Sequence, residues 1–515
     1  MSASQSNTTG PDLALGISAD ELPDGGMIAG HVGEDAVLLA RNGAELFAIG
    51  ATCSHYGGPL AEGLMVDDTV RCPWHHACFS LRTGEALRAP AFTPLTCWVV
   101  EQRDGRIFVQ SKKEVPVSAE AARTERPAAL PERIVIVGGG AAAFAAANAL
   151  RRHDYGGSIT MLSSDETPPV DRPNLSKDYL AGSAPEEWLP LAPADFYTDN
   201  GIDLRLKATV ARIDPREHQV TLADGEILAY DKLLLATGAE PIRLSIPGAD
   251  QPHVHVLRSL ADCRAIIEGA KTARRAVVLG ASFIGLEVAA SLRTRGIEVH
   301  VVAPDKHPME RTLGPQLGAF IRSFHAEKGV VFHLDDLAVA IDGESLKLRS
   351  GDTLAADLIV AGIGVRPRIE IAEGAGLAVD HGVVVDAYLQ TNAPDIFAAG
   401  DIARWPDPRS STGIRVEHWV VAERQGQTAA HNMLGEREAF DAVPFFWSQH
   451  YDLPINYVGH AVNWDEVAVE GDIEARDCLV RYKRNGRVLA VASIYRDVDS
   501  LKAEWMLERE HAIRA

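Results

Sequence analysis

Residues 133–143 read Arg-Ile-Val-Ile-Val-Gly-Gly-Gly-Ala-Ala-Ala, and this stretch determines the fold class of most of the chain. An unbroken apolar run such as 134–137 is typical of a strand buried on both faces of a parallel sheet. The run leads into Gly138-x-Gly140-x-x-Ala143 and a helix predicted over residues 141–152. There the glycines let the backbone turn tightly and approach a pyrophosphate, and the helix N-terminus stabilises the phosphates. The stretch therefore predicts a dinucleotide-binding α/β unit.

A second copy of this pattern follows later in the chain. A predicted strand over 276–279 leads into Gly280-x-Ser282-x-x-Gly285 and a helix over 283–295. Ser282 stands in place of the middle glycine, and its side chain is small enough to fit there and can donate a hydrogen bond. For either copy, the alternative is a buried strand and a packed helix with no ligand. Two copies in one chain favour two nucleotides bound in two domains.

Two short motifs indicate which nucleotide each unit binds. Ala236-Thr237-Gly238 ends the first half of the first unit, and the segment 391–401 ends in Gly400-Asp401. In flavoproteins with two dinucleotide folds, such a strand brings a carboxylate to the ribityl chain of the flavin. FAD is therefore expected at the first fingerprint. NADH or NADPH is expected at the second, which is inserted between residues 250 and 370.

Two Cys-His pairs near the N-terminus predict an iron–sulfur centre. Cys53-Ser54-His55 is followed, after sixteen residues, by Cys72-Pro73-Trp74-His75. Two thiolates can hold one iron and two imidazoles the other, as in a Rieske [2Fe–2S] centre. A structural zinc site is the alternative, but zinc motifs usually group Cys with Cys and His with His. We therefore predict that the cluster ligands are Cys53, His55, Cys72 and His75.

A neighbouring histidine, His76, could compete for the last ligand position. The segment from about residue 47 to 108 resembles Rieske ferredoxins, whose spacing selects His75. His76 occupies a position where related sequences often carry glycine, so we expect it beside the site or facing solvent. High-potential Rieske proteins carry an extra disulfide, and this chain has Gly58 and Trp74 at the positions of its cysteines. The resemblance therefore implies a lower-potential, ferredoxin-like centre.

The length and composition limit the size, the partners and the location that can be expected of the protein. The chain has 515 residues, of which 46% are apolar, and this suits three or four globular domains. Its net charge of −21 argues against a nucleic acid or an anionic membrane surface as partner. The six cysteines show no disulfide pattern, and residues 1–16 lack a signal-peptide pattern. We therefore expect a cytoplasmic protein with no membrane span.

The pattern of predicted strands and helices gives a multidomain fold. It comprises a small all-β Rieske domain, two doubly wound, glutathione-reductase-like α/β domains that bind dinucleotides, and a C-terminal α+β domain. Phe445 and Trp447 of the last domain are expected in its core. The predicted boundaries are 12–112 for the Rieske domain, 113–131 for a linker, 132–249 with 371–440 for the FAD domain, 250–370 for the NAD(P) domain and 441–515 for the C-terminal domain.

From about residue 132 to 515 the chain resembles FAD-dependent ferredoxin reductases and apoptosis-inducing-factor-like proteins, and the N-terminal motif makes it similar to their Rieske-fused members. The resemblance implies that Arg172 and Lys177 contact the flavin, that Lys177 pairs with Glu287 beside its reactive edge, and that Trp419 lies near the ring. Separate surface contacts of Lys177 and Glu287 are the alternative. The most specific segments are Asp171-Arg172-Pro173-Asn174-Leu175-Ser176-Lys177, Phe283-Ile284-Gly285-Leu286-Glu287-Val288-Ala289 and Glu417-His418-Trp419 with Gln425.

Lys177 and Glu287 are therefore the candidate catalytic residues. Asp165 is predicted at the adenosine ribose, one position after the usual acid. In the second unit, Asp305 favours NADH as the cofactor, whereas Lys306 and Arg311 leave NADPH as an alternative. The candidate cofactor-binding residues are Gly138, Gly140, Ala143, Asp165, Arg172, Lys177, Ala236, Thr237, Gly238, Gly280, Ser282, Ile284, Gly285, Glu287, Gly400, Asp401 and Trp419.

The resemblance implies an NAD(P)H-dependent flavoprotein reductase. Electrons would pass from NAD(P)H through FAD to the Rieske cluster, and on to an acceptor such as an oxygenase, a cytochrome P450 or a ferredoxin. Disulfide reductases of this fold carry a cysteine pair early in the FAD domain, whereas this chain has no cysteine between residues 131 and 250. The alternative is a redox-sensing, apoptosis-inducing-factor-like interaction protein with slow turnover. A monomer or a homodimer is expected.

Overall fold

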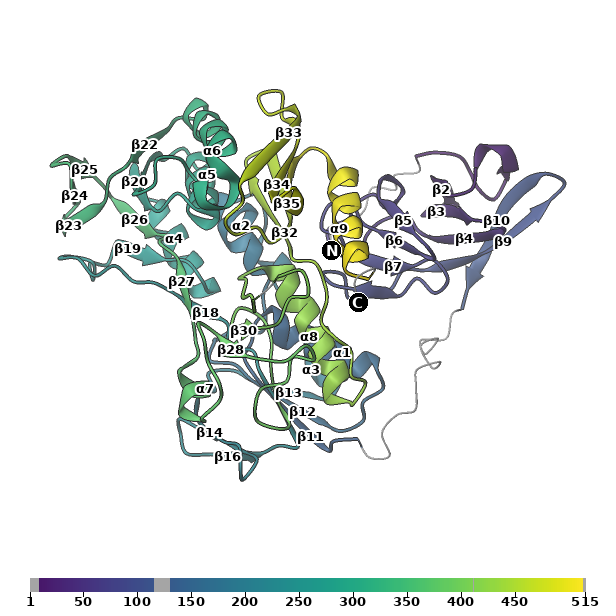
Figure 1. The fold of residues 1–515 in the computed structure, drawn as a ribbon, viewed down its shortest axis with the longest axis horizontal. Helices are drawn as coiled ribbons and strands as arrows, with labels where there is room; N and C mark the ends of the chain where they lie inside the picture. The colour runs from purple at the N-terminus through teal and green to yellow at the C-terminus, as the bar shows by residue number, and fades with distance from the viewer. Residues whose placement is uncertain (1–8, 115–129, 411, 513–515) are drawn as a thin grey trace.

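The computed structural model describes residues 9–114, 130–410 and 412–512. The chain forms an N-terminal β domain, two α/β sheets, of which the second is inserted into the first, and a C-terminal sheet with a final helix (Figure 1). Most of the predicted linker, residues 115–129, lies outside the described residues. No helix in the described ranges is both long and apolar enough to cross a membrane.

The N-terminal β domain is built from two antiparallel sheets. Strand β3 has both faces buried, because Leu38 and Ala40 pack into one core while Val37 and Leu39 pack into another. The six-stranded sheet has the order β1 (Ile17–Ser18), β10 (Arg106–Lys113), β9 (Cys97–Arg103), β4 (Glu45–Gly50), β3 (Asp35–Asn42) and β2 (Met27–Val32). The four-stranded sheet has the order β5 (Leu64–Val66), β6 (Thr69–Arg71), β7 (Cys78–Ser80) and β8 (Ala86–Arg88).

The first α/β sheet is wholly parallel, as the apolar run at 134–137 predicts. Its last strand comes from much later in the chain, since Leu233 pairs with Ile396. The order is β13 (Ile202–Arg205), β12 (Ser158–Leu162), β11 (Arg133–Val137), β17 (Lys232–Leu235) and β29 (Ile396–Ala398). A small antiparallel sheet, β14 (Val210–Asp214), β15 (Gln219–Leu222) and β16 (Ile227–Ala229), stands beside it.

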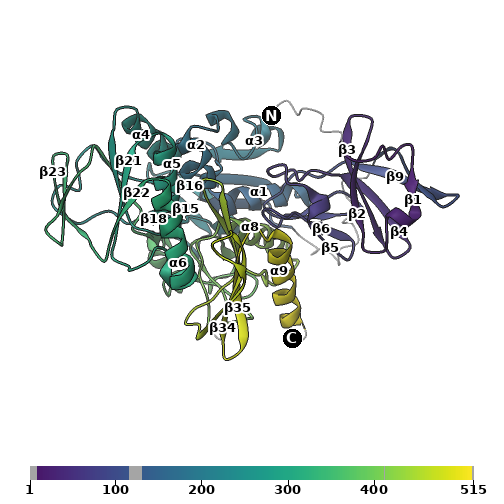
Figure 2. The ribbon, with the colours of Figure 1, turned by 90° about the horizontal axis from the view of Figure 1, so that it is seen from above.

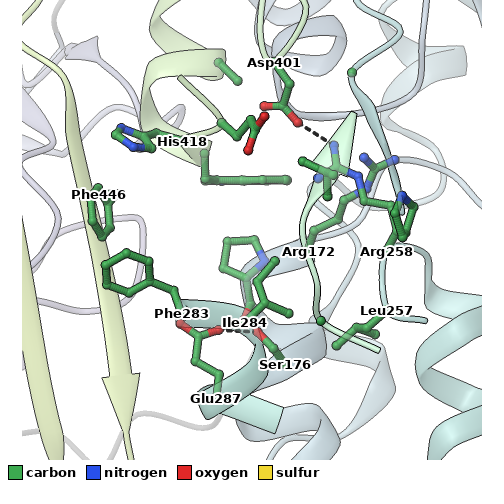
Figure 3. A pocket seen from close by; sticks show the side chains of 18 of the residues that line it. Arg172, Ser176, Leu257, Arg258, Phe283, Ile284, Glu287, Asp401, His418 and Phe446 are labelled. Carbon is green, nitrogen blue, oxygen red and sulfur yellow. Dashed lines mark hydrogen bonds and ion pairs between the residues drawn. The ribbon is translucent and has the colours of Figure 1, made fainter. Parts of the chain in front are cut away.

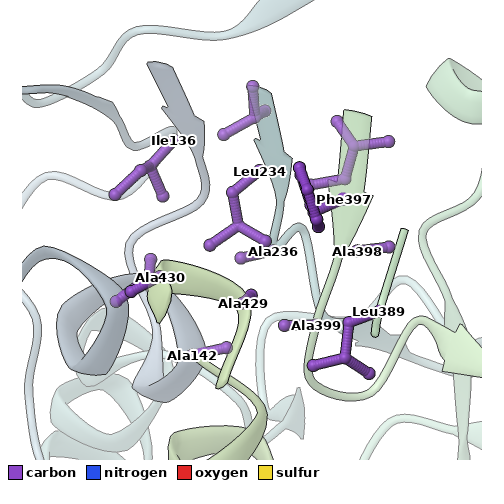
Figure 4. Packing of buried hydrophobic residues seen from close by; sticks show 14 of the residues in the cluster. Ile136, Ala142, Leu234, Ala236, Leu389, Phe397, Ala398, Ala399, Ala429 and Ala430 are labelled. Carbon is purple, nitrogen blue, oxygen red and sulfur yellow. The ribbon is translucent and has the colours of Figure 1, made fainter. Parts of the chain in front are cut away.

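Two helices, the alanine-rich α1 (Ala141–Arg152) and α8 (Trp419–Met433), pack against each other over the core of this sheet (Figure 4). Small residues at the contact let the helices approach closely. At Gly426 a Cβ atom would lie 2.2 Å from the carbonyl oxygen of Ala142, so only glycine fits there. Short segments complete this part of the chain: α2 (Asp178–Ala181), α3 (Phe196–Asp199), α7 (Glu370–Gly374), and the strand pairs β18 (Ala239–Pro241) with β27 (Val365–Pro367) and β28 (Val383–Val384) with β30 (Ala403–Arg404).

The second α/β sheet is also parallel and lies between β17 and β29 in the sequence. Its order is β19 (Val254–Val256), β26 (Leu358–Ala361), β20 (Arg275–Leu279), β21 (Glu298–Ala303) and β22 (Val330–Leu334). Its helices are α4 (Leu260–Ala270), α5 (Phe283–Thr294) and α6 (Glu310–Glu327), and a small sheet of β23 (Ala338–Asp342), β24 (Ser345–Leu348) and β25 (Thr353–Ala355) extends from it.

The C-terminal sheet is antiparallel and carries helix α9 (Asp497–Ala512). Two views show α9 between this sheet and the N-terminal β domain (Figures 1 and 2). The β domain therefore packs on the C-terminal part of its own chain. The strand order is β31 (Phe445–His450), β32 (Leu453–Gly459), β35 (Arg487–Ile494), β34 (Asp477–Arg484) and β33 (Glu466–Asp472).

Candidate functional site

Two connected cavities lie at the carboxyl ends of the parallel sheets. One has a volume of about 470 Å³ and the other about 810 Å³, and both are lined by Gly140, Arg172, Ala236 and Arg258. Side chains from both α/β units and the C-terminal sheet converge on the smaller cavity (Figure 3). An extended cleft at this edge of a doubly wound sheet suits a dinucleotide.

The first fingerprint has the close backbone approaches that its glycines predict. Gly138 has φ +140°, and a Cβ atom there would lie 2.1 Å from the carbonyl oxygen of Ala236. Gly138 and Gly140 line the larger cavity, where helix α1 begins. Ala143 does not line either cavity; it is fully buried in the core beside the sheet. These residues therefore leave room for a pyrophosphate at the α1 N-terminus.

The second fingerprint is built in the same way. Gly280 has φ +104°, and a Cβ atom there would lie 2.3 Å from the carbonyl oxygen of Gly362. A Cβ atom at Gly285 would lie 2.2 Å from the carbonyl oxygen of Gly280, so the helix packs tightly on its strand. Ser282 and Ile284 line the smaller cavity, whereas Gly280 does not. The two helix N-termini thus open onto one cleft.

Two arginines supply positive charge along the cleft. Arg172 pairs with Asp165 at 3.0 Å, and Arg258 pairs with Asp401 at 2.7 Å. Burial and the nearby Arg258 lower the pKa of Arg172 to about 10, so its guanidinium remains charged at neutral pH. Charged guanidinium groups suit the phosphates of a dinucleotide. Sequence reasoning missed Arg258, which lies in no recognised motif.

Other predicted residues line the same cleft. Ala236 and Thr237 line the larger cavity, and the Thr237 hydroxyl donates to the carbonyl oxygen of Arg368 at 2.8 Å. The smaller cavity is lined by Gly238, Gly400, Asp401 and Trp419, together with His418, Phe446 and Trp447, which were not predicted there. His418 belongs to the 417–419 segment that was quoted among the most specific of the sequence, whereas Phe446 and Trp447 belong to β31, in which no such motif was recognised.

Lys177 and Glu287 form the predicted ion pair. Lys177 Nζ lies 2.9 Å from Glu287 Oε2, and Glu287 is only 4% exposed. Hydroxyl groups of Ser176 and Ser448 donate to its two carboxylate oxygens, each at 2.5 Å. Lys177 and Glu287 also line the smaller cavity. The arrangement fixes a buried carboxylate and an ammonium at the wall of the cavity.

The Cys-His pairs lie on two loops of matching shape. The Cys53 amide donates to the carbonyl oxygen of Gly58 and the Cys72 amide to that of Ala77, both at 2.8 Å. A Cβ atom at Gly58 would lie 2.7 Å from Cys72 Sγ, so glycine leaves space between the loops. Each loop therefore presents one thiol and one imidazole to the other.

The four predicted ligands come together between the loops. The ring centroids of His55 and His75 are 5.0 Å apart, and the neighbouring Cys72 thiol lowers the pKa of Cys53. Within the described ranges His55 Nδ1 is buried with no hydrogen-bond partner. Burial lowers the pKa of His55 to about 3, so its ring is neutral, as a metal ligand must be. Two thiols and two imidazoles thus fit a [2Fe–2S] cluster.

The cluster loops lie against the smaller cavity of the same chain. The Trp447 ring lines this cavity, and its centroid is 4.2 Å from that of His75. The Tyr56 hydroxyl donates to the Asp171 carboxylate, next to the cavity-lining Arg172. We expected Trp447 in a core, but the structure places it between the loops and the cavity. Phe445 is buried, as expected.

Comparisons with known proteins identify the family of each part of the chain. The chain matches the family models of pyridine nucleotide-disulphide oxidoreductase over residues 132–426, the Rieske [2Fe-2S] domain over 15–99 and the reductase C-terminal domain over 445–515. It is 32% identical to apoptosis-inducing factor 3 of Homo sapiens, over 96% of this chain and 84% of that protein. It is 37% identical to rhodocoxin reductase of Rhodococcus erythropolis, over 73% of this chain and 90% of that protein.

Two further matches concern ferredoxin reductases. The ferredoxin–NAD(+) reductase component of an anthranilate 1,2-dioxygenase system from Burkholderia cepacia is 38% identical, over 70% of this chain and 90% of that protein. The covalent putidaredoxin reductase–putidaredoxin complex superposes with a TM-score of 0.72 at 32% identity, over 74% of this chain and 94% of that chain. The chain therefore belongs to the pyridine nucleotide-disulphide oxidoreductase family, as a ferredoxin-reductase-like member with a fused Rieske [2Fe–2S] domain.

Proposed function

We propose that the protein is an NAD(P)H-dependent reductase that sends electrons through FAD and its own Rieske cluster to an external acceptor. The observation that carries this proposal is the contact of Trp447 with His75 at the wall of the smaller cavity. This contact supports a short route between the proposed cluster ligands and the proposed flavin site of one polypeptide. The relative from Burkholderia cepacia, named as the ferredoxin–NAD(+) reductase component of a dioxygenase system, supports a ferredoxin or an oxygenase as the acceptor.

The reaction balances with one-electron acceptors. When bound, FAD accepts a hydride and releases electrons singly, and the [2Fe–2S] cluster carries one electron at a time. One NAD(P)H and two oxidised acceptor molecules thus give NAD(P)⁺, one proton and two reduced acceptor molecules. Cys53, His55, Cys72 and His75 would hold the cluster, and the α1 N-terminus with Arg172 would hold the FAD pyrophosphate.

The remaining candidate residues are proposed to position FAD or to set the charge around it. Asp165 is proposed at the adenosine ribose and Asp401 at the ribityl chain, each oriented by its arginine partner. Lys177 and Glu287 are proposed to set the charge beside the reactive edge of the flavin. The slow-turnover sensor is less well supported, because a sensor does not need cluster ligands seated against the cavity.

The preferred donor is proposed to be NADH. Arg311, which could have bound a 2′-phosphate, pairs instead with Asp305 at 3.1 Å. The relative from Burkholderia cepacia is named for NAD(+), which supports this choice. The monomeric or homodimeric state and the cytoplasmic location remain predictions.

Anaerobic titration of the purified protein with NADH tests the proposal. Visible absorbance and EPR spectra recorded after each addition should show flavin bleaching and the signal of a reduced cluster with mixed sulfur and imidazole ligands. Metal and sulfide analysis of the same sample should give two irons and two sulfides per chain. Zinc in place of iron, or an oxidised cluster beside a fully reduced flavin, would contradict the proposal.

A further inference from the structure

A carboxylate of helix α9 is buried where three parts of the chain meet. Glu504 is fully buried, and it lies among charged side chains that are also buried. Its partners come from the Rieske domain and from α8, which borders the predicted flavin site. None of these residues belongs to the proposed cofactor sites.

From the Rieske domain, Arg71 and His76 reach this carboxylate. His76 Nδ1 lies 2.9 Å from Glu504 Oε2, and Arg71 Nη1 lies 3.5 Å from the same oxygen. Arg71 and Arg88 also pair with Glu508, one turn further along α9, at 2.8 and 2.9 Å. Two carboxylates on one face of α9 thus bind three side chains of the Rieske domain.

Arg424 of α8 also pairs with Glu504. Arg424 Nη1 donates to Glu504 Oε1 at 2.7 Å, and Nη2 donates to the carbonyl oxygen of His76 at 3.2 Å. The Ala89 amide of the Rieske domain donates to the side chain of Gln427 at 3.0 Å, one turn along α8. Glu504 therefore links α8 and α9 to the loop that carries His75.

His76 has a backbone conformation that favours glycine, which indicates that its side chain is needed for the contact with Glu504. His76 has φ +60°, and its amide donates to the Cys72 carbonyl oxygen just as the amide of Gly57, with φ +79°, donates to that of Cys53. Glycine adopts this left-handed conformation easily, whereas other residues rarely do. The His76 ring is fully buried and stacks on Phe445 with a centroid distance of 3.9 Å. It is neither a solvent-facing side chain nor one of the predicted ligands.

We propose that Glu504 is a positioning residue that holds the Rieske domain in one orientation on the flavin side of its own chain. Buried ion pairs with several hydrogen bonds fix the register of an interface, because any shift leaves a charge unpaired. The cluster is then a fixed relay rather than a mobile carrier. The electron-transfer part of this inference rests on the proposed function, whereas the docking part does not.

The test compares Glu504→Gln with the wild type and with Glu510→Gln. Glu510 lies on the same helix but pairs with Arg487 of the C-terminal sheet at 3.6 Å, so it is a matched control. Small-angle X-ray scattering reports docking, and anaerobic stopped-flow mixing with NADH separates flavin reduction from cluster reduction. Glu504→Gln should raise the undocked fraction about tenfold or more, because it leaves buried arginines uncompensated.

The expected result is a larger maximum dimension and slower cluster reduction in Glu504→Gln, with flavin reduction by NADH unchanged and Glu510→Gln like the wild type. If Glu504→Gln fails to fold, Glu508→Gln gives the answer, since Glu508 is partly exposed and contacts the Rieske arginines. Wild-type scattering and wild-type cluster reduction in the folded variant would overturn the inference. A compact wild type that never reduces its cluster would instead overturn the proposed function and leave the docking role standing.

Discussion

Glu287 illustrates how a single buried carboxylate is kept in place by distant parts of the chain. Its donors come from Ser176 and Lys177 in one segment and from Ser448 in β31. Ser448 is in turn bonded to His450 Nε2 at 3.1 Å, and His450 Nδ1 lies 3.2 Å from His325 Nε2. With an ionised carboxylate, each group in this series can donate its proton to the next: His325 to His450, His450 to Ser448, and Ser448 to Glu287.

The Lys177–Glu287 pair should behave as one unit. Lys177→Met leaves a buried carboxylate without its cation, and a loss of about 3–5 kcal/mol in the free energy of unfolding is expected. Adding Glu287→Gln should restore part of that loss, with a coupling energy of about 1–3 kcal/mol. Denaturant unfolding of the two single variants and the double variant measures the coupling. Strictly additive losses would show that the two side chains act separately.

His450 should make stability depend on pH. Burial lowers the pKa of His450 from 6.5 to about 3, so between these values the unfolded chain binds a proton that the folded chain does not. The free energy of unfolding should therefore fall as the pH drops below 6.5, by about 1.4 kcal/mol per pH unit for this residue. Unfolding curves between pH 5 and 7 should show a shallower dependence in His450→Gln. An unchanged slope would contradict a neutral buried His450.

At the scale of elements, the short motifs could be predicted from the sequence, but the residues that fold against them could not. The fingerprints at 138–143 and 280–285 and the Cys-His loops carry their function in adjacent residues, so spacing alone indicates the chemistry. Arg258 and Trp447 line the cleft, and His450 bonds to Ser448 behind Glu287, only because separate segments fold together. The ligand neighbour His76 was expected beside the site or in solvent, and its burial depends on α9, which lies more than 400 positions later.

The contact between helices α1 and α8 gives a prediction for an element. Gly426→Ala should destabilise the protein by about 1–3 kcal/mol, because the new Cβ would lie 2.2 Å from the Ala142 carbonyl oxygen and the helices must separate. Gly374 in helix α7 has no atom within 4 Å of its Cβ position, so Gly374→Ala is the matched control. It should be neutral or stabilising by up to about 1 kcal/mol. Midpoints of denaturant unfolding distinguish the two, and equal shifts would contradict close helix packing at Gly426.

At the scale of the whole molecule, the fused Rieske domain covers the side of the smaller cavity, the proposed flavin site, where Trp447 lies. The cluster loops contact β31 and α8 there, and α8 contacts α9, although these segments come from different parts of the chain. A second protein cannot occupy that side while the domain is docked. External partners are therefore expected to receive electrons from the Rieske domain and not from the flavin.

Cys72→Ser tests that route, because it removes one of the two thiolates proposed to hold the cluster. Flavin reduction by NADH should keep its wild-type rate, since the cavity keeps its lining, while reduction of a protein acceptor such as cytochrome c should be lost. A small oxidant such as ferricyanide can reach the flavin and should still be reduced. Cys78→Ser is the control, because Cys78 is a buried thiol of β7 that is not a predicted ligand. Wild-type reduction of cytochrome c by a cluster-free Cys72→Ser protein would mean that electrons leave directly from the flavin.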